Sequence, residues 1–224
     1  ELEAAQQIDY YFMKGHNMDA VVANYRQLTG ACPMFPLSLF GYTQSKERYC
    51  SSEELESIVR EYRQRQIPLD MIVQDWSYWP SGHWGEMKMD SKFYPDKKAL
   101  ADSIHTMHCK LMISIWPNAQ YCPQNEDFKK RGWILPGGSV YDAFNPQARS
   151  LYWDYANKEF FQNGFDAWWC DSSEPVDGDW NNPMPKGYTY DSHQKRWQLN
   201  TQALSDVLGA ERSQTYSLYH AMGI

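Results

Sequence analysis

Apolar and polar positions follow two alternating spacings along most of this 224-residue chain. Short continuous apolar runs, typical of buried strands, are followed by longer stretches in which apolar residues recur every three or four positions, as in amphipathic helices. The predicted strands cover residues 36–41, 69–74, 111–116 and 165–170. Because strand and helix alternate, the pattern predicts an α/β fold with parallel strands joined by right-handed crossovers.

The predicted helices carry recognisable start and stop signals. Ser51 and Glu54 form a capping box, in which each residue can satisfy a backbone amide of the first turn. Asn145 followed by a proline is a helix start, and Asn163 followed by a glycine is a helix end. The helices are expected over 17–29, from 51, from 96, over 145–163 and over about 200–222.

Loop lengths favour a (β/α)₈ barrel of the TIM type over an open doubly wound sheet. The long aromatic loops (76–95, 117–145 and 172–199) all follow strands, and no glycine-rich phosphate turn follows the first strand. A complete barrel needs eight β/α units and about 250 residues. We therefore expect only about the first four units here: residues 1–30 as the end of an upstream region with a lead-in helix, and 31–224 as the first half of the barrel.

Composition narrows the possible partners. The chain has 10 Trp, 16 Tyr and 9 Phe, a surplus that fits a carbohydrate-binding protein, although aromatic residues also fill ordinary cores. A net charge of −7 without a basic cluster argues against nucleic acid and anionic membrane surfaces. No apolar stretch approaches the ~20 residues of a membrane span. The first residues lack the basic and apolar regions of a signal peptide.

Cysteine and histidine positions predict neither a metal nor a cofactor. The five cysteines fall in no CxxC or Cys/His ligand spacing, so we interpret them as isolated small residues of the core and loops. His105 and His108 share a helix face at i and i+3 but have no partner motif.

The segment 167–175, Ala-Trp-Trp-Cys-Asp-Ser-Ser-Glu-Pro, says most about function. An apolar run stops abruptly at Asp171, which places a carboxylate at the tip of a buried strand, where barrel enzymes hold their chemistry. Two indoles beside it would partly desolvate the carboxylate and could stack on the apolar face of a sugar. The alternative is structural: Asp171 caps the loop and Glu174 pairs with a neighbouring base.

Several motifs resemble family 31 of the glycoside hydrolases, the retaining α-glucosidases and α-xylosidases. Phe40-Gly41-Tyr42-Thr43-Gln44-Ser45 is similar to the family's first strand, and Gln74-Asp75-Trp76 and Ser114-Ile115-Trp116-Pro117 are similar to its second and third. Trp169-Cys170-Asp171-Ser172-Ser173-Glu174-Pro175 resembles its nucleophile motif.

The resemblance implies roles for five residues. Asp171 would be the catalytic nucleophile, and Asp75, Trp116, Trp169 and Glu174 would bind or support the substrate. Retaining hydrolysis also needs a general acid about 5–5.5 Å from the nucleophile. The family's acid/base motif does not occur in these 224 residues, so we expect the acid beyond them and this chain alone to be inactive.

Departures from the glucosidase motif favour an α-xylosidase acting on xyloglucan-type oligosaccharides. Ser172-Ser173 replaces Met-Asn, and a second indole, Trp168, precedes the motif and could fill the space of the missing CH₂OH. An α-glucosidase, and a non-catalytic carbohydrate-binding half-barrel, remain the alternatives. The missing barrel half, or a second copy, is the expected protein partner. The compartment stays open, with the periplasm or secretion slightly favoured by the resemblance.

Overall fold

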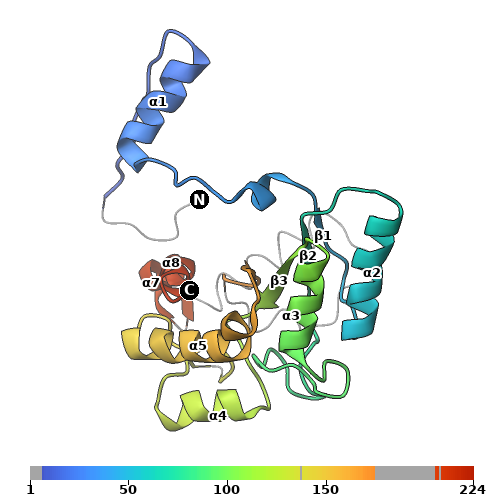
Figure 1. Cartoon of the computed structure of the whole chain (residues 1–224). Helices are drawn as coiled ribbons and strands as arrows, with labels where there is room; N and C mark the ends of the chain where they lie inside the picture. The colour runs from blue at the N-terminus through green and yellow to red at the C-terminus, as the bar shows by residue number, and fades with distance from the viewer. Residues whose placement is uncertain (1–6, 137, 175–204, 207) are drawn as a thin grey trace, which may run out of the picture.

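The computed structural model describes residues 7–136, 138–174, 205–206 and 208–224. Its centre is a parallel four-stranded sheet in the order β1-β2-β3-β4 (Figure 1). The strands are β1 (Thr43–Gln44), β2 (Met71–Gln74), β3 (Lys110–Ile115) and β4 (Ala167–Cys170). Sequential strands are neighbours and a helix lies in each crossover, so the predicted barrel-type α/β fold is confirmed.

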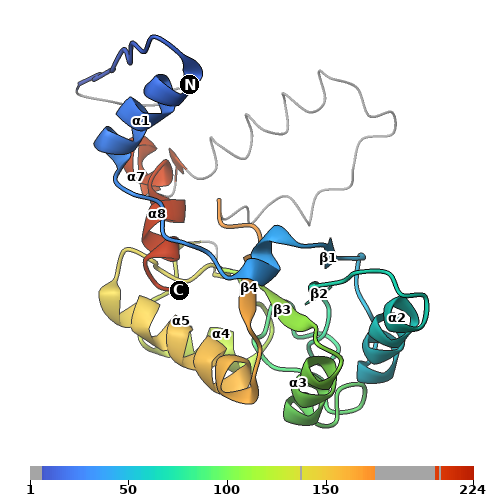
Figure 2. The ribbon, with the colours of Figure 1, turned by 45° about the horizontal axis from the view of Figure 1, so that its top comes forward.

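Helices α2 (Ser52–Gln64), α3 (Lys97–Thr106) and α5 (Pro146–Glu159) pack on one face of this sheet (Figure 2). Their buried apolar side chains meet Ile72, Leu111 and Ile113 of the strands in one core cluster. Each helix begins at a side-chain cap. The predicted capping box is confirmed in part: Ser51 Oγ accepts from the amide of Glu54 at 3.1 Å, but Glu54 reaches back to the amide of Cys50.

The prediction of a strand over 36–41 is wrong. Pro36 is followed by the 3₁₀ helix η1 (Leu37–Phe40), and pairing with β2 starts only at Thr43. Gly41 lies so close to Asp70 that a Cβ would sit 1.9 Å from the carboxylate, and the amide of Tyr42 donates to the same carboxylate at 3.2 Å. The Asp70 contact thus fixes where the chain can join the sheet.

The loop predicted over 117–145 contains a helix, α4 (Pro123–Lys130). Its buried side chains are Gln124, Asn125 and Phe128, so it lacks the apolar periodicity from which helices are predicted. Proline at its first turn and basic residues at its last turn were the available signals.

Two predicted helix ends also differ. α5 ends at Glu159 and is followed by the 3₁₀ helix η2 (Phe161–Asn163), with Gly164 in the left-handed region at φ 94°. In the described part of the expected helix 200–222, α7 (Ala210–Ser213) and α8 (Tyr216–Ala221) are separate. α8 lies beside α5 in both ribbon views (Figures 1 and 2), and the ring of His220 in α8 contacts that of Tyr152 in α5.

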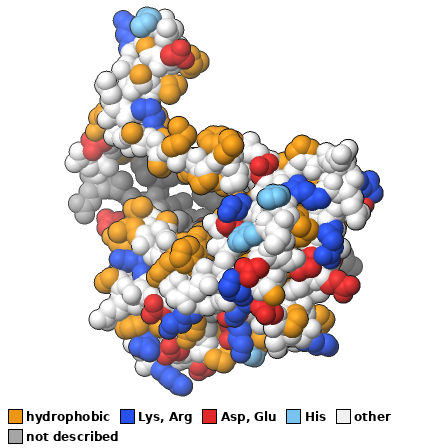
Figure 3. Space-filling view, in the orientation of Figure 1, with side chains coloured by type: hydrophobic (Ala, Val, Ile, Leu, Met, Phe, Trp, Pro, Cys, Tyr) orange, Lys and Arg blue, Asp and Glu red, His pale blue; other side chains and the backbone are white. Residues whose placement is uncertain are grey.

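The predicted lead-in helix is confirmed as α1 (Met18–Thr29), capped by Asn17. It has no buried residue and projects from the rest of the molecule (Figure 1). Apolar side chains are exposed along the segment that joins α1 to the sheet (Figure 3). They are Met34, Phe35, Leu37, Leu39 and Phe40.

Candidate active site

The carboxyl ends of β2, β3 and β4 bring the predicted site residues to one edge of the sheet. Asp75 follows β2, Trp116 follows β3 and Asp171 follows β4. The strands are parallel and in register here, so their ends lie side by side. In parallel barrels this edge is the one that carries catalytic groups.

Side-chain alternation separates the two indoles of β4. Trp168 packs on the helix side, with its ring centroid 5.8 Å from that of Trp153 and 6.3 Å from that of Phe160. Successive strand residues point to opposite faces, so Trp169 lies on the face away from the helices, where it is 46% exposed. Asp171 comes directly after the strand, where its amide also donates to the carbonyl of Trp169 at 3.1 Å. The expectation that Trp168 fills space beside the sugar is therefore wrong.

The backbone fixes Asp171 at the strand tip. Its amide donates to the carbonyl of Ile115 in β3 at 3.0 Å, and its carboxylate Oδ1 accepts from the amide of Ser172 at 2.9 Å. Ser172 has φ 48°, a left-handed conformation that costs a non-glycine residue roughly 1–2 kcal/mol. The chain therefore turns sharply after the carboxylate, and hydrogen bonds hold that turn.

Electrostatics mark Asp171 as unusual among the described acids. Burial raises the pKa of its carboxyl, and the like charges of Asp75 and Glu174 raise it further, while the Ser172 amide opposes the rise. The charges of Asp75 and Glu174 thus act on Asp171 at this edge. An acid whose pKa is raised by burial and by neighbouring charges is typical of a functional site.

Asp75 is held as firmly as Asp171. Its Oδ1 accepts from the amide of Trp76 at 2.8 Å. The side chain of Gln74, fully buried, donates to the carbonyls of Tyr49 and Asp75 at 3.0 and 3.1 Å, which ties the end of β2 to the loop after β1. A carboxylate with a fixed backbone is suited to orient hydroxyl groups of a ligand.

Trp116 is placed differently from Trp169. It is only 3% exposed, and its ring lies 5.7 Å from that of Trp84 in a T-shaped contact. Trp84 in turn contacts Trp76 and Trp79 at 5.5 and 5.3 Å. In the described residues, Trp169 offers an open ring to a ligand, while Trp116 supports the aromatic loop after β2.

Comparison with known proteins relates this chain to an enzyme family. Residues 32–224 match the model of the glycosyl hydrolases family 31 TIM-barrel domain. The chain belongs to glycosyl hydrolase family 31. The resemblance drawn from the motifs is thereby confirmed.

Named relatives of this family 31 chain include α-xylosidases. It is 43% identical over 177 residues to an α-xylosidase of Saccharolobus solfataricus, covering 79% of the chain and 24% of that protein. A solved GH31 α-xylosidase from Xanthomonas citri has a TM-score of 0.72 at 32% identity, covering 92% and 23%. A second solved GH31 α-xylosidase, from a soil metagenome and complexed with xylose, has a TM-score of 0.67 at 28% identity. That match covers 91% of this chain and 30% of the other. The chain thus spans about a quarter to a third of the length of these relatives.

One residue of this family 31 chain at the site was not found from the sequence. The guanidinium of Arg48, in the loop after β1, lies 4.6 Å above the ring of Trp76, next to Asp75. Arg48 also has a left-handed backbone, at φ 50°. Neither motif nor periodicity indicates such a contact, because it depends on that turn.

The described residues contain no cluster of three or more His, Cys, Asp and Glu side chains that could hold a metal ion. His105, a residue considered in the sequence, instead contacts Asp166 at 2.8 Å. Within the same ranges, every helix is too short or too polar to cross a membrane. The aromatic residues expected after Pro175 in the loop after β4 lie outside the described residues.

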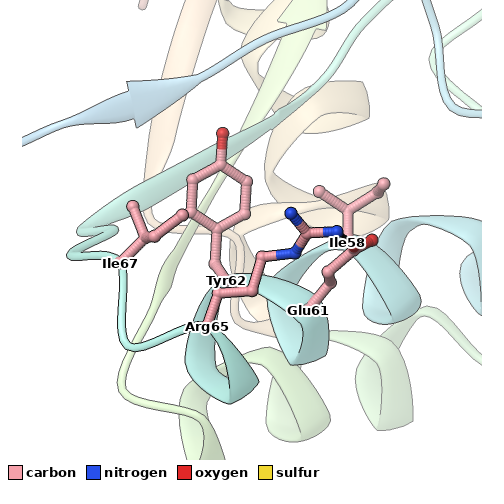
Figure 4. A pocket seen from close by; sticks show the side chains of 5 residues that line it. All are labelled: Ile58, Glu61, Tyr62, Arg65 and Ile67. Carbon is pink, nitrogen blue, oxygen red and sulfur yellow. Dashed lines mark hydrogen bonds and ion pairs between the residues drawn. The ribbon is translucent and has the colours of Figure 1, made fainter.

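A pocket of about 260 Å³ lies on α2 (Figure 4). Its lining residues are Ile58, Glu61, Tyr62, Arg65 and Ile67. Tyr62 donates from its hydroxyl to Gln44 of β1 at 2.8 Å, which places the pocket beside the edge strand. It holds none of the predicted site residues.

Proposed function

We propose that the protein is a retaining α-glycoside hydrolase in which Asp171 is the nucleophile. The observation that carries the proposal is the position of Asp171: it directly follows β4 at the carboxyl edge of the sheet, half-buried and within electrostatic reach of Asp75 and Glu174. Membership of family 31 supports it.

The chemistry would proceed in two displacements. The carboxylate of Asp171 attacks the anomeric carbon while the glycosidic C–O bond breaks, and a general acid protonates the leaving oxygen. Water, deprotonated by the same group, then hydrolyses the glycosyl ester and restores the carboxylate. In this scheme Asp75 binds sugar hydroxyls, Trp169 stacks on the ring, and Trp116 supports the aromatic loop after β2.

Glu174 lies close to Asp171 but is a poor general acid. The acid and the nucleophile of a retaining hydrolase flank the scissile bond, whereas Glu174 follows Asp171 by three residues on the same segment and is exposed. We therefore assign Glu174 a supporting role and expect the acid from a part of the protein outside these 224 residues.

The proposed substrate is a terminal α-xylosyl residue of a xyloglucan-type oligosaccharide. The names of the similar proteins support xylose: the two solved structures and the Saccharolobus relative are all called α-xylosidases. Since Trp168 packs on α5, its bulk gives no support for xylose. The remaining support in the chain is the Ser172-Ser173 pair that replaces Met-Asn.

Steady-state kinetics of the intact protein on aryl α-xyloside and aryl α-glucoside would test the substrate. We expect kcat/KM to favour the xyloside by about 10–200-fold, the range that one small apolar group provides. Equal values or a glucoside preference would indicate an α-glucosidase. Binding of the sugars without turnover would indicate a carbohydrate-binding module.

A further inference from the structure

The turn that carries Asp171 is held from outside by one helix. Within the turn, Ser173 Oγ donates to the carbonyl of Cys170 at 3.0 Å, and the Ser172 amide donates to Asp171. A third bond comes from 44 residues further along the chain: Ser217 Oγ of α8 donates to the carbonyl of Ser173 at 3.0 Å.

Two buried residues anchor α8. Tyr216 and His220 are 0% and 1% exposed, and both bond to Tyr141: the Tyr216 hydroxyl donates to its carbonyl at 2.9 Å, and His220 Nδ1 lies 2.8 Å from its hydroxyl. Burial lowers the pKa of His220 to about 4, so its ring is neutral at neutral pH. α8 is therefore fixed to the core at two points, on either side of Ser217.

The same aromatic cluster holds the end of β3. Tyr141 stacks on Tyr152 of α5 at a centroid distance of 4.6 Å, and the Tyr152 hydroxyl donates to the carbonyl of Trp116 at 3.0 Å. The amide of Asp171 is bonded to Ile115, the residue before Trp116. One packed unit thus supports both the strand end beneath Asp171 and, through Ser217, the turn after it.

We propose that Ser217 is a positioning residue that keeps the Asp171 carboxylate in its reactive geometry. The inference rests on the proposed function of Asp171. Ser217 itself would touch neither substrate nor reacting atoms. It would counteract the left-handed strain at Ser172 by fixing the carbonyl of the next residue.

Loss of the hydrogen bond from Ser217 to Ser173 should let the turn after β4 relax. The Ser172 amide would then no longer stabilise the ionised Asp171 carboxylate. The charged groups that face Asp171 among the described residues, Asp75 and Glu174, are both acids and cannot replace that donor. The pKa of Asp171 should rise further, and the acid limb of kcat/KM should move to higher pH.

The test compares Ser217→Ala with Ser217→Thr and Ser213→Ala in the intact enzyme. Ser213 is a matched control, because in α7 its hydroxyl donates to the carbonyl of Ala210 at 3.0 Å and does not bond the turn. We expect Ser217→Ala to lower kcat about 3–10-fold, the effect of one lost hydrogen bond, with KM nearly unchanged and the acid limb at higher pH. Ser217→Thr should restore both values, and Ser213→Ala should match the wild type.

Equal kcat and acid limb in Ser217→Ala and Ser213→Ala would overturn the inference while leaving the proposed function intact. An Asp171→Ala enzyme that retains full activity would instead overturn the proposed function, and this inference with it. Where Ser217→Ala fails to fold, Ser217→Cys keeps the shape with a weaker donor. The Ser217→Cys enzyme should then show a smaller shift of the acid limb to higher pH. A pH profile equal to that of the wild type would again refute the role of Ser217.

Discussion

At the scale of single residues, two aspartates of the same strand region show opposite electrostatics. Asp171 sits among acids, and burial raises the pKa of its carboxyl. Asp166 is exposed as a residue, and the partial desolvation of its carboxyl acts to raise its pKa. Lys110 Nζ, the Leu111 amide and His105 Nε2 contact the carboxylate at 2.8, 2.9 and 2.8 Å, and together they lower the pKa. The ionised carboxylate of Asp171 therefore destabilises the folded protein, whereas that of Asp166 stabilises it.

We predict that Asp171→Asn raises the melting temperature at pH 7, whereas Asp166→Asn lowers it. The folded pKa of Asp171 lies above the unfolded one, so its ionisation destabilises the fold as pH rises through that window. For Asp166 the stabilisation is present above the unfolded pKa and is lost as pH falls through the folded one. Its replacement should cost only about 0.5–1 kcal/mol, because Asp166 is exposed and solvent screens its ion pairs. Thermal unfolding followed by circular dichroism would decide, and a loss of stability in Asp171→Asn would contradict the electrostatic account.

At the scale of elements, the two adjacent tryptophans of β4 lie on opposite faces of the sheet. Trp168 faces α5 and belongs to the core, while Trp169 faces the open side. The sequence pattern could not separate them, because a continuous apolar run carries no period-2 signal. Only the packing of Trp153 and Phe160 against Trp168 shows which face is covered.

We expect Trp168→Ala to destabilise the protein by roughly 3 kcal/mol, the lower end for a core tryptophan, with the ratio of xyloside to glucoside turnover unchanged. Trp169→Ala should cost little stability and raise KM, because it removes a stacking surface. Denaturant unfolding and kinetics on both variants would test this pair. A changed ratio of xyloside to glucoside turnover in Trp168→Ala would show that the Trp168 indole contacts the sugar, contrary to this account.

The strand and helix order could be predicted from the sequence, since buried runs and caps such as Asn145 are local signals. The strand expected over 36–41 failed because a long-range contact, from Gly41 to Asp70, decides where the sheet begins. The predicted site residues at the strand tips lie at one edge of the sheet for a topological reason, because parallel strands end at the same edge. Arg48 and Ser217 could not be found, because their contacts join distant segments.

At the scale of the whole molecule, the described sheet has two edges, β1 and β4. A closed barrel has none, and the named relatives are about three to four times as long as the region matched here. Trp169 of the edge strand and the apolar segment around η1 are exposed. Such surfaces favour association with the rest of a barrel or with another copy.

Residues 1–224 on their own should therefore self-associate or aggregate and should not hydrolyse glycosides. The proposed nucleophile Asp171 is present, but we propose no group among the described residues as the general acid, whose protonation of the leaving group is worth about 10²–10⁴-fold. Sizing chromatography and an aryl α-xyloside assay of this polypeptide would check both points. A monomer that turns over substrate would contradict the half-barrel account and make Glu174 the candidate acid.

The central claim is that Asp171 forms a covalent bond to the sugar. It is tested most directly by incubating the intact enzyme with a 5-fluoro-α-glycosyl fluoride, which slows hydrolysis of the intermediate, and mapping the label by peptide mass spectrometry. The account predicts a glycosyl ester on Asp171, within the peptide covering 165–175, and no label in Asp171→Ala. A label on Glu174, or on a carboxylate elsewhere in the protein, would contradict it.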